Sequence, residues 1–418
     1  MAEQVGAPGL AGSGPSPVVG VRGVLSEGAL AAVSVAVGAS VAEATKAAYA
    51  ADWVRFQAWC EANGFTALPA DPLVVASFLV ETARVVKENG TPGFAASTLT
   101  RWVASINNQH TAAGVDPPGR TEVVRRTLAG IRKTRATPPS RVRPLRLAEA
   151  QQIITAGRER AAAGTFADQL AERRNTALVL LGYLGAFRES ELVGLDVGDV
   201  VLDEDGLILV VRLSKTDQQG AGMVKAINRR KNVDTCAPCA WVRWSAVLDA
   251  HDTGGNTAVL QVLRADRDLP TRHVCHPPDP KSTEPAGPHQ TGGGDRASAP
   301  GERPAVPPQA EKRVLSPGRA VFRPFTPAGW LAGRRLHRER VRGTVRAEAA
   351  KAGLDPAIVS RLGGHSLRAG FVTDAMAAGA RPDEIMRQTG HRNAATVEIY
   401  RRDRPIVGNA VLRLPDKK

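Results

Sequence analysis

Residues 365–400 read HSLRAGFVTDAMAAGARPDEIMRQTGHRNAATVEIY, and this stretch decides the fold of the C-terminal part of the chain. His365 and Arg368 stand three residues apart after a glycine pair, so a helix that opens there carries both side chains on one face. His391 follows in Gln-Thr-Gly-His, and Tyr400 stands nine residues after it. The stretch therefore predicts helices that present two histidines, an arginine and a tyrosine.

Two further basic residues lie upstream. Arg188 belongs to the motif GAFRESEL, which follows the apolar run 179–183. A buried helix that ends in an arginine offers a planar, permanently charged fork for a phosphate. The residues alone equally allow a salt bridge from Arg188 to Glu189 or Glu191. Lys215 lies in Ser-Lys-Thr after a β run, at a hairpin tip where a lysine commonly faces solvent.

Tyr400 differs from the other two tyrosines of the chain. Tyr49 and Tyr183 fall on apolar stripes and are predicted to lie in the core, whereas Tyr400 is followed by two arginines whose field would favour a phenolate. The alternative is a third core tyrosine, docked through Val397 and Ile399. For the histidines and for Arg368, the alternatives are a solvated helix pair and a helix-capping histidine.

Two arginines, two histidines, a lysine and a tyrosine are the groups a protein would need to break a DNA phosphodiester without metal or ATP. This set, in this order, resembles the tyrosine recombinase (phage integrase) family. The resemblance runs from about residue 40 to about residue 404 and implies that the catalytic residues are Arg188, Lys215, His365, Arg368, His391 and Tyr400.

The family also implies a role for each of these residues. Arg188 and Arg368 would clamp the phosphate, with Glu191 holding Arg188 in place. Lys215 would enter the minor groove and protonate the 5′-oxygen leaving group. The two histidines would move protons or donate to the phosphate, and the Tyr400 phenol would attack phosphorus.

The implied function is that of a site-specific DNA recombinase or integrase. Such enzymes cut one strand at a time, form a 3′-phosphotyrosyl link and exchange strands within a tetramer on duplex DNA; the free protein would be a monomer or a dimer. The alternatives are a type IB topoisomerase-like enzyme that nicks and reseals, and a DNA-binding relic with a dead site. No cofactor is expected, because no glycine directly precedes a lysine as in a Walker-type loop and no acidic cluster suggests catalytic magnesium.

The charge balance also favours a polyanionic partner, although an arginine-rich genome would produce a similar excess. The net charge is +14, from 55 Lys and Arg against 41 Asp and Glu. Between residues 120 and 146 only Glu122 is acidic. We expect this segment to lie along a phosphate backbone rather than to be only a solvated linker; its basic residues are Arg120, Arg125, Arg126, Arg132, Lys133, Arg135, Arg141, Arg143 and Arg146.

The patterning predicts a mainly α chain with a small antiparallel β-sheet (α+β), which begins with a small all-α domain. The resemblance implies that this is a core-binding (SAM-like) domain and that a tyrosine-recombinase catalytic domain follows it. The expected segments are a disordered tail 1–39, the helical DNA-binding domain 40–135, a basic linker 136–146, the catalytic domain 147–408 with a disordered Pro/Gly-rich insertion 269–318, and a tail 409–418.

Individual elements are also predicted. Apolar residues recur at helical spacing from Tyr49 to Cys60, with Asn63-Gly64 as a left-handed cap. In the catalytic domain we expect a long helix over 174–193 and a hairpin with strands over 207–211 and 223–227.

The four cysteines do not make a disulfide framework. Cys236-Ala-Pro-Cys239, followed by His273-Val-Cys275-His276, has elements of a zinc site. Its second half is irregularly spaced and borders the expected insertion. We therefore favour a Cys-Pro turn that leads into a core helix and expect no metal.

No apolar run reaches the ~18 residues that a membrane-spanning helix needs. The chain also does not open on a signal-peptide pattern. We expect a cytoplasmic, nucleoid-associated protein without a membrane partner.

Overall fold

The computed structural model divides the chain into two compact units, Met1–Ser140 and Arg141–Lys418. The residues that the structure describes are 26–39, 41, 43–135, 142–212, 222–266, 272–275 and 318–398.

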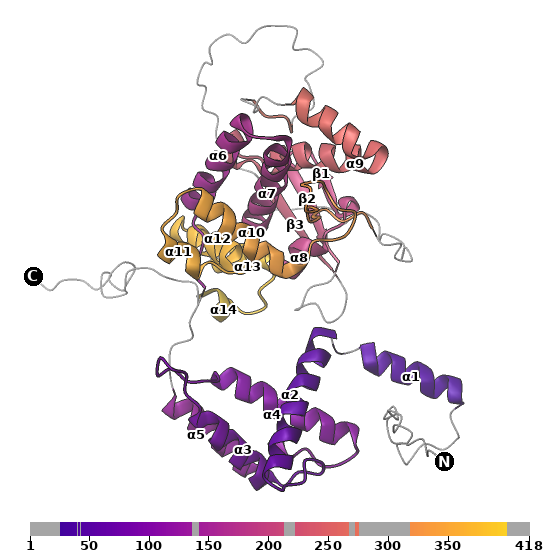
Figure 1. Cartoon of the computed structure of the whole chain (residues 1–418), viewed down its shortest axis with the longest axis vertical. Helices are drawn as coiled ribbons and strands as arrows, with labels where there is room; N and C mark the ends of the chain where they lie inside the picture. The colour runs from indigo at the N-terminus through magenta and orange to yellow at the C-terminus, as the bar shows by residue number, and fades with distance from the viewer. Residues whose placement is uncertain are drawn as a thin grey trace, which may run out of the picture. The chain divides into compact units, whose positions relative to one another are not determined.

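Among the residues described for the first unit, the regular elements are helices (Figure 1). Its core is aromatic: Phe56, Phe78 and Trp102 are buried, and Phe78 contacts both other rings at centroid distances of 5.2 and 5.4 Å. Ring packing of this kind adds to plain area burial and fixes how the helices cross. The elements are α1 (Glu27–Ala39), α2 (Glu43–Ala62), α3 (Pro72–Arg84), α4 (Ala96–Ala112), the 3₁₀ turn η1 (Pro118–Arg120) and α5 (Glu122–Thr134).

Most of the expectations for this unit are met. Phe56 and Cys60 are buried along α2, and Gly64 has the left-handed backbone of a cap, with φ of 70°. Two details are wrong. Residues 27–39 form α1 inside the tail that was expected to be disordered, because the stretch is rich in alanine, the best helix former. Tyr49 is only half-buried, outside the core of the unit.

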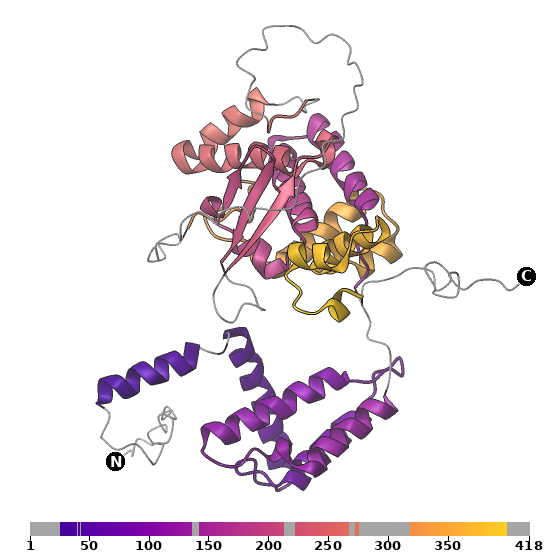
Figure 2. The ribbon, with the colours of Figure 1, turned by 180° about the vertical axis from the view of Figure 1, so that it is seen from behind.

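The second unit combines helices with a three-stranded antiparallel sheet in the order β1-β2-β3 (Figures 1 and 2). β2 pairs with β3 from Gly206↔Asn228 to Val211↔Met223. The elements are α6 (Leu147–Ala163), α7 (Phe166–Leu184), α8 (Glu189–Gly194), η2 (Val197–Asp199), β1 (Val200–Leu202), β2 (Gly206–Val211), β3 (Met223–Asn228), η3 (Val233–Thr235), α9 (Ala237–Ala265), α10 (Arg338–Lys351), α11 (Pro356–Arg361), α12 (Ser366–Ala377), α13 (Pro382–Thr389) and α14 (Ala394–Glu398).

Helix α7 is the centre of this unit and packs against α6, α9 and α12. Its last two turns are buried on every side, from Ala177 to Tyr183. A helix that is apolar all round needs neighbours on all faces, and the surrounding helices supply them. In both views α9 lies at one end of the unit, and α13 and α14 lie at the other (Figures 1 and 2).

The predicted helix 174–193 is wrong, because it is two helices. α7 ends at Leu184 and α8 begins at Glu189. Between them Ala186 has a φ of 47°, a left-handed conformation that no right-handed helix can contain. Consequently Arg188 is the N-cap residue of α8 rather than the end of a long helix.

The basic segment 120–146 does not form one continuous linker. Its first part is η1 and α5, with Val124 and Leu128 in the core of the first unit. Its last part belongs to the second unit, where the Leu145 amide donates to the Ser366 carbonyl at 2.9 Å and the Leu145 side chain is buried. Residues 136–141 lie outside the described residues.

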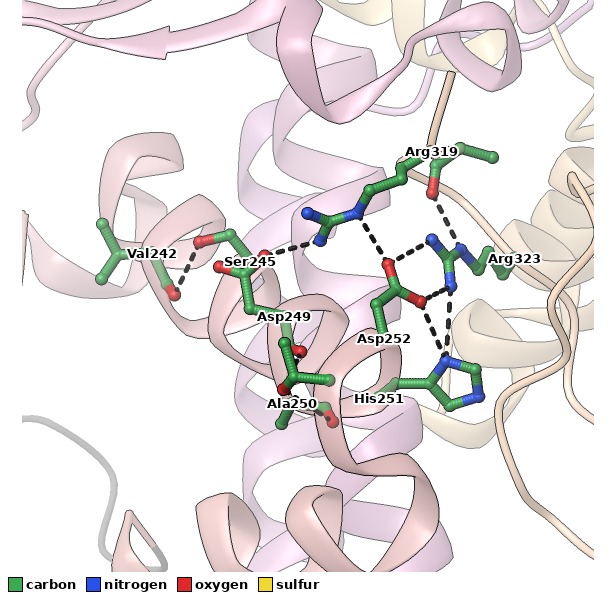
Figure 3. A network of polar contacts seen from close by, with 10 residues as sticks. Val242, Ser245, Asp249, Ala250, His251, Asp252, Arg319 and Arg323 are labelled. Atoms are coloured by element: carbon green, nitrogen blue, oxygen red, sulfur yellow. Dashed lines mark hydrogen bonds and ion pairs between the residues drawn. The ribbon is translucent and has the colours of Figure 1, made fainter. Parts of the chain in front are cut away.

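Both borders of the expected insertion are tied to α9. Arg319 and Arg323 converge on Asp252, with nitrogen–oxygen distances of 2.7 Å for Arg319 and of 2.6 and 2.9 Å for Arg323 (Figure 3). These hydrogen bonds from Arg323 hold the pKa of the Asp252 carboxyl far below its usual range. On the other side, residues 272–275 lie inside the predicted insertion, yet Cys275 is buried, so a disordered assignment for them is wrong. Residues 267–271 and 276–317 lie outside the described residues.

Within the part of the chain that the structure describes, no helix is both long enough and apolar enough to span a bilayer.

Candidate active site

Four of the six predicted catalytic residues lie in the described part of the chain: Arg188, His365, Arg368 and His391. Lys215 and Tyr400 lie outside the described residues, and so does the hairpin tip that was expected to carry Lys215.

Arg188 is held by Glu191, as predicted. The guanidinium Nη1 contacts the Glu191 carboxylate, and the Arg188 amide donates to its Oε2 at 3.0 Å. Burial works against ionisation of Glu191, but the hydrogen bonds from Arg188 outweigh it and keep the pKa of Glu191 below its usual value. The carboxylate therefore stays charged and fixes the fork of Arg188 at the start of α8.

Arg368 lies on α12 and is fully buried, with 0% of its surface exposed. Its Nη1 donates to the carbonyl of Ala186 at 2.7 Å. A buried guanidinium needs acceptors because it cannot shed its proton. The left-handed Ala186 supplies one of them by turning its carbonyl toward α12, so the break between α7 and α8 also positions Arg368.

His391 follows the left-handed cap of α13, where Gly390 has a φ of 68°. The Thr389 hydroxyl donates to the Ile385 carbonyl at 2.7 Å, so at its 3.0 Å contact with His391 it acts as the acceptor for Nδ1–H. This contact assigns the proton of the neutral ring to Nδ1, so Nε2 carries the lone pair.

Burial and nearby cations lower the pKa of His391 to about 4. After burial, the contributions come from Arg368, Arg188, His365 and Lys225, in that order. His365 is the exposed N-cap residue of α12, one turn before Arg368. The positive charges of Arg368 and Arg188 therefore act on His391, and an anion bound beside it would offset them.

Lys225 is the member of this environment that the sequence analysis missed. Only 1% of its surface is exposed, and its Nζ donates to the carbonyls of Gly185 and Gln388, both at 2.7 Å. It thus joins the turn before Arg188 to the end of α13 before His391. Burial, with Arg368 and Arg188, lowers the pKa of Lys225 to about 7, against an opposing effect of Glu191.

A strand rule could have identified Lys225. Side chains two apart on a strand point to the same face, and Lys225 stands between Met223 and Ile227 on β3. The predicted strand 223–227 therefore already implied an inward lysine.

The cysteine segment forms the core helix that was expected, with Trp241 and Trp244 of α9 buried. The fold also brings two distant residues to it: Cys236, Cys239, His273 and Cys275 place one donor atom each within 4.8 Å of one another. In the sequence, the irregular spacing of the second half of this motif argues against a metal site. His276 lies outside the described residues.

Comparisons with known proteins point to the same family as the residue motifs. The sequence model of the phage integrase family matches residues 309–405, the range that holds His365, Arg368, His391 and Tyr400. The "Integrase/recombinase xerD homolog" of Selenomonas ruminantium is 27% identical over 365 residues, which is 86% of this chain and 82% of that protein.

Two solved structures are similar to the chain at low TM-scores. The crystal structure of XerA recombinase is similar with a TM-score of 0.34 and 16% identity, covering 92% of this chain and 97% of that one. A lambda integrase dimer bound to a COC′ core site is similar with a TM-score of 0.41 and 15% identity, covering 83% of each chain.

Proposed function

Since the chain belongs to the tyrosine recombinase (phage integrase) family, we propose that it is a site-specific recombinase that cuts and rejoins duplex DNA through a 3′-phosphotyrosyl link to Tyr400. The observation that supports this most strongly is geometric: Arg368 binds the Ala186 carbonyl, two residues before Arg188, and Lys225 joins the Gly185 carbonyl to the Gln388 carbonyl, three residues before His391. A phosphodiester is an anion with two non-bridging oxygens, and two fixed guanidinium groups match it.

The proposed roles follow from the chemistry of each group. Arg188 and Arg368 stabilise the charge that builds on the phosphate oxygens as a fifth oxygen approaches phosphorus. His391 is neutral in the free protein, and its Nε2 would gain a proton and donate to an oxygen once the phosphate offsets the field of the arginines. His365, exposed at the start of α12, would accept the phenol proton.

Lys215 and Tyr400 complete the proposed reaction. The Tyr400 oxygen forms a bond to phosphorus while the bond from phosphorus to the 5′-oxygen breaks. Lys215 gives a proton to that 5′-oxygen, because an alkoxide is a poor leaving group. The bond energy is kept in the phosphotyrosyl link, so rejoining by another 5′-hydroxyl needs neither ATP nor a metal in the reaction.

The proposed partner is duplex DNA that carries a recombination site, with strand exchange inside a homotetramer. Similar proteins are known in complex with DNA, such as XerH bound to difH substrate and the Tn1549 integrase with transposon right end DNA. The net charge of +14 is of the sign such a partner requires.

A suicide substrate tests the proposal. A duplex that carries the recombination site, with a nick next to the scissile phosphate, loses a short fragment after cleavage and cannot be resealed. We expect wild type to give a covalent protein–DNA band on a denaturing gel, and Tyr400→Phe to give none while it still binds the DNA. Arg368→Lys keeps the charge but loses the planar fork and should lower the cleavage rate at least tenfold.

The remaining outcomes separate the alternatives. A band on any duplex, together with relaxation of supercoiled DNA that lacks the site, would indicate a topoisomerase-like enzyme. DNA binding without a band on any substrate, from a library of duplex sequences, would indicate a dead-site binder.

A further inference from the structure

Four metal-binding side chains meet at the start of α9, outside the residues that the proposed reaction uses. Cys236 is the N-cap residue of α9 and Cys239 lies in its first turn, whereas His273 and Cys275 come from the segment 272–275 beyond the end of that helix. The two pairs are brought together only by the fold.

The distances match one tetrahedral ion. Zn–S bonds of about 2.3 Å put the sulfurs of a tetrahedral site about 3.8 Å apart, and a histidine nitrogen about 3.6 Å from each sulfur. The Cys275 Sγ lies 3.4 Å from the Cys239 Sγ and 3.9 Å from the Cys236 Sγ. The His273 Nδ1 lies 3.3 Å from the Cys239 Sγ and 3.9 Å from the Cys275 Sγ.

The histidine is oriented as a ligand. The His273 Nε2 lies 3.2 Å from the Lys231 carbonyl, which can only accept, so Nε2 carries the proton and Nδ1 faces the sulfurs with its lone pair. An imidazole that donates its other N–H to a backbone carbonyl is the usual arrangement around bound zinc.

The surroundings are closed and support the sulfurs. Cys236, Cys239 and Cys275 are 0%, 2% and 1% exposed. The Arg229 Nη2 donates to the Cys275 carbonyl at 2.9 Å and to the Asp203 carbonyl at 2.9 Å, which ties the segment 272–275 to the β1–β2 turn. With four protein ligands and no open position, the arrangement suits a structural rather than a catalytic ion.

Two other readings fit less well. A disulfide needs sulfurs about 2.05 Å apart, far closer than any pair here, and would leave the third cysteine and His273 without a role. Three packed thiols could be simple core residues, but a core does not require an imidazole nitrogen aimed at them.

We propose that Cys236, Cys239, His273 and Cys275 bind one structural zinc ion. Each thiol loses its proton on binding, so three thiolates and Zn²⁺ make a site of net charge −1. The ion would fix the segment 272–275 to the start of α9, at one border of the expected insertion. Arg319 and Arg323 hold the other border to the same helix through Asp252 (Figure 3).

Metal content of the full-length protein tests this directly. The chain is expressed and purified with a reductant and without chelators, and its metals are counted by plasma mass spectrometry. We expect one zinc per chain. Replacement by cobalt should give the intense visible bands of a tetrahedral ion and a near-ultraviolet thiolate band.

Matched cysteine variants locate the ion. Cys239→Ser and Cys275→Ser should lose the zinc and the cobalt bands, and the wild-type protein stripped of metal should unfold at a lower temperature than the loaded protein. Cys60→Ser is the control, because Cys60 is an equally buried thiol of the first unit and should leave one zinc per chain.

Three results would overturn the site. The first is a reduced wild-type protein that holds no metal and takes up neither zinc nor cobalt. The second is a disulfide among Cys236, Cys239 and Cys275, detected as a loss of two mass units. The third is full zinc content in Cys239→Ser. The wild-type measurement stands even if a variant fails to fold.

Discussion

At the scale of the residue, Lys225 is a buried ammonium that is held by carbonyls rather than by a carboxylate. Its pKa of about 7 lies below the ~10.4 of a lysine in an unfolded chain. Below about pH 7 both states hold the proton, and the cost of burying the charge is present in full. Between about 7 and ~10.4 the unfolded chain holds more protons, so the free energy of unfolding rises with pH.

Replacing Lys225 with Met should remove this pH dependence. Relative to the variant, wild type should gain up to about 1.4 kcal/mol of unfolding free energy per pH unit between pH 7 and 9, as measured by urea unfolding. Lys351→Met, at an exposed lysine of the same unit, is the control and should follow wild type. Parallel curves for wild type and Lys225→Met would show that Lys225 does not titrate in this range.

His391 should take up a proton when DNA binds. With a pKa of about 4 it is neutral in the free protein at pH 5.5. A phosphate beside Arg188 and Arg368 cancels their field, so the pKa rises and the ring becomes charged. Calorimetry in buffers of different ionisation enthalpy, on the Tyr400→Phe background, should show up to one more proton taken up than in the same protein with His391→Gln.

The decisive quantity is the difference in proton uptake between the proteins with and without His391. The total uptake alone is not decisive, because His365 lies in the same electrostatic field and can also take up a proton. Equal proton uptake with and without His391 would contradict the proposed role. His337→Gln, at a histidine that is 65% exposed, should change nothing.

At the scale of the element, the spacing of apolar residues in the sequence predicted where helices and strands lie. The strands 207–211 and 223–227 were found within one residue, and the helical stretch 49–60 lies inside α2, whereas α1 was missed. The break before Arg188 was not, because it depends on the backbone of Ala186, whose carbonyl is bound by Arg368 from α12. The pair Arg188–Glu191 was predictable since it is local, whereas the approach of His273 to Cys239 needs the whole fold.

Helix α12 depends on a close approach that only glycine allows. A side chain at Gly370 would overlap the backbone carbonyl of Leu145, the residue whose amide donates to Ser366 at the start of α12. Gly370→Ala should lower the free energy of unfolding of the second unit by about 1–3 kcal/mol in urea unfolding. It should also lower the rate of DNA cleavage, because a shift of α12 displaces Arg368.

Gly343 provides the matched control for this prediction. It lies in the exposed middle of α10, with no atom within 4 Å of an added Cβ. Gly343→Ala should be neutral or stabilise by up to about 1 kcal/mol, because alanine is the better helix former. A similar effect of both substitutions would mean that α12 is not constrained by the Leu145 backbone.

At the scale of the whole molecule, the relevant property is the excess of basic over acidic side chains. The excess of 55 Lys and Arg over 41 Asp and Glu predicts salt-dependent binding to DNA. The net charge does not show which face of the protein contacts the DNA backbone. The first unit offers a specific face, because Arg126 and Lys133 are exposed, seven residues apart, and therefore on one side of α5.

Arg126→Ala and Lys133→Ala should each weaken binding to every duplex by a similar factor, since phosphate contacts carry no sequence information. Each should also reduce the slope of log K against log salt by about 0.9, the effect of one phosphate contact, in anisotropy titrations between 50 and 200 mM salt. Arg264→Ala removes the same charge from an exposed position of α9. If the loss of binding came from net charge alone, Arg264→Ala would lower the slope as much as the α5 variants do, and α5 would not be the face that contacts DNA.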